Sequence, residues 1–375
     1  MTVKKKVEHS VKDIDRELIN RGAQVPEHER FNFSDKDGTP ERENIMRQIK
    51  VLYNSAPSPN SALKDINTWD LIEELLLKIE KKIKRGIWGK DDRMDFYQLK
   101  EIEQPAKLRG IMRAESGDST IEDIEKIINN AECVAAICLQ ENLLNKEKGF
   151  STLKHKNYGK TFNLCDLEPF RNQPIAAGRL CTGFLVKEDI IATAGHCADE
   201  KNVTELRIVF GFKMLGLSTP VTWIPNENIY KGVKIIHRVY DPKGSGADWE
   251  LIKLDRKVEG HSPVKLSKKA VYLNQPVYIL GHPCGLPLKY ASGAQVRGIT
   301  DACFSADLNV YSGNSGSPVF DRKTHEVIGI VVRGDTQDFR WTCKGWLSVI
   351  YPNPVIRSQQ PQCTRVSEFS GTLGE

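Results

Sequence analysis

The sequence lacks any long run of apolar residues among its 375 positions. A helix that crosses a bilayer needs about 20 consecutive apolar residues, so no membrane-spanning helix is expected. The first residues, MTVKKKVEHSVKDIDREL, carry positive charges with no apolar stretch behind them, which excludes a secretory signal of the usual form. The absence of such a signal predicts a cytoplasmic protein.

A large excess of one charge is also absent. Lysine and arginine number 54 against 49 aspartates and glutamates, and the formal net charge is +5. Proteins that bind nucleic acid usually present a concentrated basic face, so no nucleic-acid partner is expected. The locally basic stretch KIEKKIKRG (78–86) is typical of the solvated side of a helix.

No two cysteines form a CxxC pair, which excludes the commonest structural zinc patterns. A zinc site built from His196, Cys197, His282 and Cys284 has no familiar spacing, so no metal or other cofactor is expected. The nine cysteines still leave one or two disulfides, and an extracytoplasmic location, open. All lie after residue 130: Cys133, Cys138, Cys165, Cys181, Cys197, Cys284, Cys303, Cys343 and Cys363.

Residues 1–85 are predicted to form a helical N-terminal extension. Its strongest helix has one apolar stripe and ends in a basic turn before Gly86, where cations suit the helix dipole. An isolated helix of this length is marginal in water. The extension therefore packs on itself, docks on the next domain or binds a partner protein. The stripe consists of Trp69, Ile72, Leu76, Ile79 and Ile83.

Residues 86–375 are predicted to form a second, mainly β domain. One helix comes early, because Ser119 and Glu122 form a capping box ahead of Ile124, Ile127 and Ile128. Roughly a dozen short apolar runs separated by turn residues predict strands in a barrel, a sandwich or two small barrels. These runs cover 133–139, 181–186, 189–194, 205–212, 233–240, 249–254, 275–281, 294–299, 317–321, 326–332 and 346–350.

Three segments of this domain carry chemistry. Thr193-Ala194-Gly195-His196-Cys197 follows a predicted strand, Asp248 opens another, and Gly313-Asn314-Ser315-Gly316-Ser317-Pro318 precedes a third. A serine hydroxyl needs a base to become a nucleophile, and a histidine oriented by a carboxylate supplies it. The flanking glycines leave the N–H groups of Gly313 and Ser315 able to point at a developing oxyanion.

Two other acids flank Asp248. Asp255 ends the predicted strand and would point away from its start, and Asp241 precedes Pro242 and Gly244, which suits a surface turn. His282, in Gly281-His282-Pro283-Cys284, is predicted to be a turn residue. The chain order of His196, Asp248 and Ser315 is one in which this catalytic set is known.

TAGHC, DWELIKL and GNSGSPVF resemble the three active-site blocks of the chymotrypsin-like serine peptidases. With Glu326-Val327-Ile328-Gly329-Ile330, the third block is most similar to the bacterial glutamyl endopeptidase branch. Asp91-Asp92-Arg93 also resembles an Asn-Asp-Arg stretch near the mature N-terminus of those enzymes. The resemblance implies two six-stranded antiparallel barrels, with His196 and Asp248 from the first and Ser315 from the second.

The same resemblance points to the substrate pocket. Asn309, six residues before the serine, takes the position at the base of that pocket. Where the glutamyl branch has a threonine and a histidine, this chain has Val310 and Val331. We expect a pocket for an uncharged side chain, with Arg333 at its rim favouring a nearby acid.

The resemblance also implies a disulfide between Cys181 and Cys197, and Cys284–Cys303 and Cys343–Cys363 are further candidate pairs. The predicted function is a serine endopeptidase that acts on proteins or peptides through an acyl-enzyme. Three alternatives stay open. The domain could be an inactive pseudopeptidase that serves as a binding module, residues 1–85 could be an adaptor that recruits a partner, or they could be a pro-segment removed near Arg85–Gly86 or Asp91–Arg93.

Overall fold

The computed structural model describes residues 87–88, 91–101, 121–147, 149–178, 180–241, 243, 245–334, 338–342, 345–351 and 360–374. The predicted helical extension, residues 1–85, lies outside the described residues, and so does Ser119 of the predicted capping box. Apart from the end of β19, the elements below belong to one unit of the chain, Lys84–Phe339 with Gly345–Glu375.

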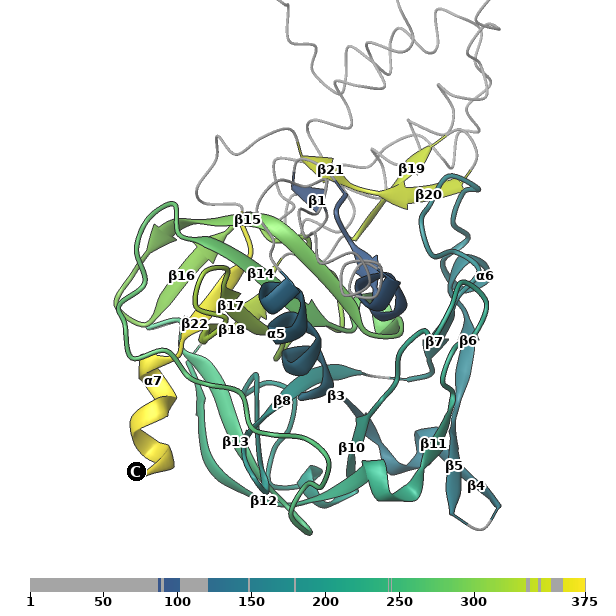
Figure 1. Ribbon diagram of the computed structural model, residues 1–375, viewed down its shortest axis with the longest axis horizontal. Coiled ribbons are helices and arrows are strands. Elements are labelled where there is room, and N and C mark those ends of the chain that lie inside the picture. The colour runs from purple at the N-terminus through teal and green to yellow at the C-terminus, as the bar shows by residue number, and fades with distance from the viewer. Residues whose placement is uncertain are drawn as a thin grey trace, which may run out of the picture. The chain divides into compact units, whose positions relative to one another are not determined.

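The first barrel is a closed ring of six strands in the order β10-β12-β13-β9-β8-β3. Every neighbouring pair in the ring is antiparallel. The barrel lies in the lower half of Figure 1. Its strands are β3 (Val134–Leu139), β8 (Cys181–Lys187), β9 (Ile190–Thr193), β10 (Leu206–Phe210), β12 (Ile229–Tyr240) and β13 (Asp248–Leu254).

Bulky apolar side chains fill this barrel. Phe184, Ile191, Ile208 and Leu251 come from four different strands and are fully shielded from solvent. β-branched and aromatic residues pack well on the pleated surface of a sheet, which explains why these short apolar runs form strands. The six predicted strands of this barrel are confirmed.

The second barrel closes in the same way. The order β14-β17-β18-β22-β16-β15 returns to its start through the β14–β15 pair, and all its pairings are antiparallel. β2 (Met94–Asp95) adds a seventh strand beside β15. The barrel strands are β14 (Pro276–Gly281), β15 (Lys289–Ile299), β16 (Cys303–Ala306), β17 (Pro318–Asp321), β18 (Val327–Arg333) and β22 (Gln362–Arg365). The predicted fold of two six-stranded antiparallel barrels is therefore confirmed.

The predicted early helix is α5 (Ile121–Glu132). Ile124, Ile127 and Ile128 are buried in the main apolar core. The amide of Asn130 donates to Tyr278 Oη at 2.9 Å and to the His325 carbonyl oxygen at 3.1 Å, both in the second barrel. In Figure 1 the helix crosses the region where the two barrels meet, so it helps to join them.

The remaining elements are short. β4 (Leu143–Glu147), β5 (Phe150–Leu153) and β11 (Trp223–Pro225) form a small sheet, and β6 (His155–Asn157) pairs with β7 (Pro174–Ala176). None of the helices in the described part of the chain has the length and apolar character to span a bilayer. The others are β1 (Ile87–Trp88), α6 (Tyr158–Phe162), β19 (Phe339–Thr342), β20 (Gly345–Ser348), β21 (Ile350–Tyr351) and α7 (Ser367–Ser370).

Candidate active site

Strand register brings the predicted histidine and aspartate together. β9 and β13 are antiparallel with Thr193 opposite Glu250, so the residues that follow β9 lie beside the residue that begins β13. His196 Nδ1 is 2.8 Å from Asp248 Oδ2, and the His196 backbone N–H donates to Asp248 Oδ1 at 3.1 Å. The imidazole is thus held at two points by one carboxylate.

Asp248 is itself fixed from the second barrel. It is 1% exposed, its N–H donates to Thr364 Oγ1 at 3.0 Å, and that hydroxyl donates back to the Asp248 carbonyl at 3.1 Å. The two neighbouring acids are engaged elsewhere. Asp241 accepts from the Ser245 N–H, and Asp255 accepts from the Lys231 N–H. Asp248 is therefore the acid that the fold places at His196.

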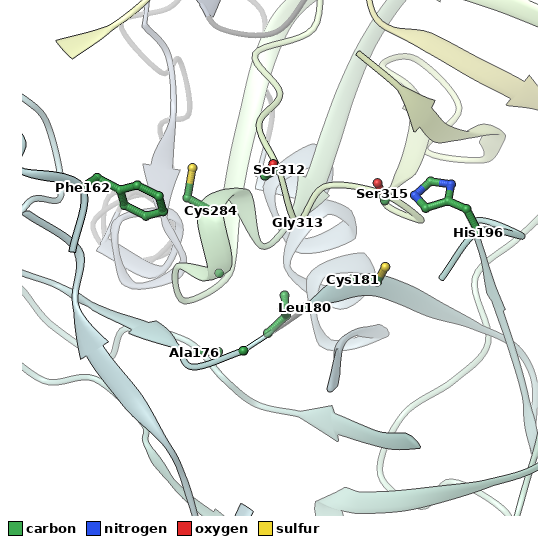
Figure 2. Close-up of a pocket in the computed structure, with 11 residues that line it drawn as sticks. Phe162, Ala176, Leu180, Cys181, His196, Cys284, Ser312, Gly313 and Ser315 are labelled. Atoms are coloured by element: carbon green, nitrogen blue, oxygen red, sulfur yellow. The ribbon is translucent and has the colours of Figure 1, made fainter. Parts of the chain in front are cut away.

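Ser315 lies on the loop between β16 and β17, and it lines the same pocket as His196. Figure 2 shows Ser315 next to the His196 ring. We call residues 309–316, which contain the predicted nucleophile Ser315, the nucleophile loop. A residue of the first barrel holds this loop, because the Thr182 N–H donates to the Ser315 carbonyl at 2.8 Å. The structure thus brings all three predicted catalytic residues to one place.

The glycines beside Ser315 are required by the backbone. Gly313 and Gly316 have φ of 91° and 87°, in the left-handed region that side chains disfavour. A Cβ on Gly313 would lie 2.5 Å from the His282 carbonyl oxygen, and one on Gly316 would lie 2.0 Å from that of Thr182. Within the described part of the chain, the N–H groups of Gly313 and Ser315 donate to no other group. Both remain available to a ligand.

Part of the chain is similar to a known protein family. Residues 181–330 match a family model described as the trypsin-like peptidase domain. The matched part contains His196, Asp248 and Ser315. Curated proteins gave no significant match.

Solved structures match as well. One is the VesB protease of Vibrio cholerae, with 15% sequence identity and a TM-score of 0.38. The match covers 64% of this chain and 63% of that chain, so a third of each lies outside it. The placement of the domain in the bacterial glutamyl endopeptidase branch stays a prediction.

Two residues that support the nucleophile loop were not singled out for this role from the sequence. Thr182 Oγ1 donates to the Gly313 carbonyl at 2.8 Å and accepts from the His282 N–H at 3.1 Å. His282 is a turn residue at the start of Pro283–Gly285, as predicted, but it is 1% exposed. Its Nδ1 lies 3.0 Å from the Leu286 carbonyl oxygen, and burial lowers its pKa to about 4. The domain therefore carries a neutral histidine behind its nucleophile loop.

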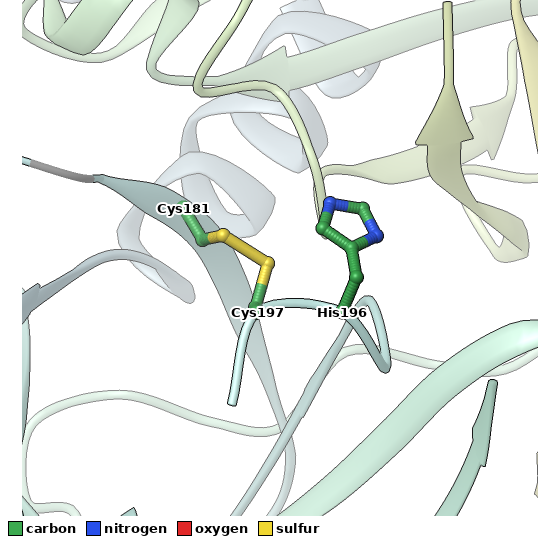
Figure 3. Close-up of side chains that lie close together, drawn as sticks. All are labelled: Cys181, His196 and Cys197. Carbon is green, nitrogen blue, oxygen red and sulfur yellow. A yellow bond between two sulfur atoms is a disulfide. The ribbon is translucent and has the colours of Figure 1, made fainter. Parts of the chain in front are cut away.

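The predicted disulfide between Cys181 and Cys197 is confirmed, with an S–S distance of 2.07 Å. Figure 3 shows it beside His196. The donor atoms of these three side chains lie within 4.8 Å of one another. Metals bind thiolates, however, and here the two sulfurs are bonded to each other. In this oxidised form, His196 is the one side chain of the three that can still bind a metal ion strongly.

The other candidate disulfides are wrong. Cys284, Cys303 and Cys363 are buried thiols. Cys284 belongs to a cluster around Tyr158 and Tyr311, whereas Cys303 and Cys363 lie on the paired strands β16 and β22. Cys284 and Cys303 therefore pack in different clusters. Cys343 lies outside the described residues.

The predicted substrate-pocket residues differ in exposure. Asn309 is 5% exposed and donates to Asp92 Oδ1 at 2.6 Å. Val310 and Val331 are buried together in the core of the second barrel. Arg333 is partly exposed, donates to the Gly246 carbonyl at 2.7 Å and lines a cavity of about 690 Å³ with Gly246 and Cys303. Their roles in substrate recognition stay predictions.

A buried acid lies on the same strand as Asp248, two residues further along. Glu250 is fully shielded from solvent on β13, and its Oε2 is 3.8 Å from Arg238 Nε. Burial raises the pKa of Glu250 to about 8, and the nearby Asp248 charge raises it further, although Arg238 opposes the shift. The Arg238 side chain also donates to the Gly195 carbonyl at 2.6 Å. Glu250 is therefore largely neutral at pH 7.

Proposed function

We propose that this chain is a serine endopeptidase, with Ser315 as nucleophile, His196 as base and Asp248 as its orienting acid. The observation that carries the proposal is that His196, paired with Asp248, lines one pocket with Ser315. With Nδ1 of His196 donating to Asp248, Nε2 keeps a lone pair with which to take the serine proton.

The reaction follows from these positions. Ser315 Oγ bonds to the carbonyl carbon of the scissile peptide as its proton passes to His196 Nε2. The N–H groups of Gly313 and Ser315 stabilise the oxyanion of the tetrahedral intermediate. The C–N bond then breaks, and His196 returns the proton to the departing amine. Water attacks the acyl-enzyme by the same route, releasing the acid and restoring Ser315.

The pocket around Ser315 favours uncharged side chains near the scissile bond. Its volume is about 320 Å³, and none of the described residues that line it is a lysine, arginine, aspartate or glutamate. Figure 2 shows Phe162, Leu180 and Cys284 on its walls. Arg333, which lines a separate cavity, would favour an acidic residue elsewhere in the peptide.

A fluorophosphonate probe tests the proposed nucleophile. The full-length protein should be labelled, and Ser315→Ala should abolish labelling with an unchanged circular dichroism spectrum. Ser312→Ala is the matched control, because Ser312 lies on the same loop and lines the same pocket. Continued labelling of Ser315→Ala refutes the assignment. Absence of labelling in every form favours the pseudopeptidase alternative.

Incubation with a denatured proteome, followed by mapping of new termini, tests the substrate class. We expect uncharged residues next to the cut, and a profile dominated by lysine or arginine would contradict the proposed pocket. Mass measurement of the enzyme in the same experiment reports on residues 1–85. A shortened, active chain indicates a pro-segment, whereas an intact active chain favours an adaptor.

A further inference from the structure

The segment Asp91–Arg93 contacts the nucleophile loop at two positions. Asp92 Oδ1 accepts from Asn309 Nδ2 at 2.6 Å, across 217 residues of sequence. The guanidinium carbon of Arg93 lies 4.7 Å from the centroid of the Tyr311 ring. A segment that precedes both barrels therefore contacts the loop that carries Ser315.

The Arg93 side chain is fixed by two carboxylates. It is 1% exposed, and it donates from Nε and Nη2 to the two oxygens of Asp91 at 2.9 and 2.8 Å. Nη2 also donates to Glu168 Oε1 at 3.2 Å, and Glu168 is itself buried. A buried guanidinium is stable only with such partners. Because these hydrogen bonds lie in the plane of the guanidinium, the flat face of the Arg93 guanidinium can stack on the Tyr311 ring.

Glu168 connects Arg93 to a further strand. Its Oε2 accepts from the Ser348 N–H at 2.8 Å. The two residues that follow Arg93 in the chain form β2. Met94 pairs with Tyr290 of β15, and Asp95 pairs with Lys289. Arg93 is thus held by charge to Asp91 and Glu168, and the residues that follow it are held to the second barrel by backbone pairing.

Tyr311 transmits this position to the reacting groups. The Tyr311 carbonyl accepts from the Asn314 N–H at 3.1 Å, which closes the turn that contains Gly313. Tyr311 is 2% exposed, so its ring has little room to move. Because Ser315 follows this turn directly, displacement of Tyr311 would move both N–H donors of the proposed oxyanion site.

We propose that Arg93 is a positioning residue, which acts through Tyr311 to hold the Gly313 and Ser315 N–H groups in line with the reacting carbonyl. This inference rests on the proposed peptidase function. Oxyanion donors act mainly on the transition state. Loss of Arg93 should therefore slow the chemical step and leave binding nearly unchanged.

The test measures the rate at which a fluorophosphonate probe phosphonylates the full-length protein at a series of probe concentrations. The maximal rate and the probe concentration that gives half of it are determined separately. Arg93→Met should lower the maximal rate about 10–100-fold, with the half-maximal concentration within about twofold. Arg93→Lys retains the charge but lacks the planar fork, so it should recover part of the loss. Arg256→Met is the matched control, since Arg256 stacks on Tyr230 at 4.0 Å in the first barrel. It should react like the parent protein.

A folded Arg93→Met that reacts at the parent rate overturns the inference while the proposed function stands. If Arg93→Met does not fold, Arg93→Lys and Tyr311→Leu decide in its place. Both should lose maximal rate without a matching change in half-maximal concentration, and parent-like rates in both overturn the inference. A parent protein that the probe does not label overturns the proposed function first.

Discussion

The hydroxyl of Thr182, on β8 of the first barrel, donates to the carbonyl oxygen of Gly313 on the nucleophile loop of the second. The same hydroxyl accepts from the His282 N–H, and the Thr182 N–H donates to the Ser315 carbonyl. One fully buried residue thus joins the barrels at the point where the chemistry is proposed to occur.

Thr182→Val keeps the shape of this side chain and removes both hydrogen bonds of its hydroxyl. The buried Gly313 carbonyl and His282 N–H would be left unpaired, at a cost of about 1–3 kcal/mol in unfolding free energy. Probe labelling should slow as the loop loses its support. Urea unfolding and labelling kinetics measure both effects, and Thr182→Ser is the control that keeps the hydroxyl. Equal behaviour of the two variants would refute this role.

Asp248→Asn should keep the fold and lower the maximal rate of peptide cleavage about 10⁴-fold, because an amide favours the wrong histidine tautomer. The matched control is Asp241→Asn, on an acid that binds a surface turn instead. Cleavage rates on a substrate from the proteome experiment provide the measurement. A loss of less than tenfold for Asp248→Asn would argue against the proposed role.

His282 should make the protein sensitive to acid. Its pKa falls to about 4 in the folded state because of burial, below the ordinary value of 6.5. Between these values only the unfolded chain binds the proton, so stability decreases as pH falls. The loss from pH 7.5 to pH 5 should be roughly 2 kcal/mol. His282→Asn keeps a donor to Leu286 and should lack this component in urea unfolding at the two pH values.

Glu250 should make the stability of the protein decrease as pH rises, which is opposite to the effect of His282. Its pKa is raised from 4.5 to about 8, mainly by burial, so between these values only the folded state holds the proton. The contribution of this raised pKa to the free energy of unfolding is fully present below about pH 4.5 and decreases as pH rises toward 8. Glu250→Gln should remove roughly 3 kcal/mol of pH dependence between pH 5 and pH 8. Parallel stability curves for the variant and the parent would contradict the assignment.

The disulfide closes a short loop, because Cys181 and Cys197 are 16 positions apart in the sequence. Restriction of the unfolded chain by such a loop contributes about 3 kcal/mol. The double variant Cys181→Ala/Cys197→Ala should lose about that much in urea unfolding under oxidising conditions. Reduction of the parent should have a similar effect. Cys165→Ala removes a buried thiol that is not in a disulfide, so reductant should destabilise this variant as much as the parent, whereas the double variant should not respond to reductant.

Much of the fold was accessible from the sequence because the barrel strands are apolar. All six strands of the first barrel were predicted, as were β14, β15, β17 and β18 of the second. β16 and β22 were missed, since Cys303–Ala306 and Gln362–Arg365 mix polar and apolar residues and show no clear run. Closure of the barrel, rather than local composition, makes these segments strands.

The site divides in a similar way. His196 and Ser315 lie in motifs that a single segment reveals, and strand register then places Asp248 beside the histidine. Thr182 and Arg93 have no local signature for their contacts with the nucleophile loop. The Thr182–Gly313 hydrogen bond spans 131 residues. Such contacts exist only once the barrels have packed, so the letters alone could not indicate them.

The pairing of β2 with β15 means that the sheet of the second barrel is built from segments on both sides of the first barrel in the sequence. Asp95 and its partner Lys289 are 194 residues apart, and the whole first barrel lies between them. During synthesis β2 leaves the ribosome long before β15 exists, so its docking must wait until the first barrel can already have folded. Contacts between distant segments form slowly. The segment that carries Arg93 is therefore expected to be among the last to dock, which would delay a competent nucleophile loop until the chain is nearly complete.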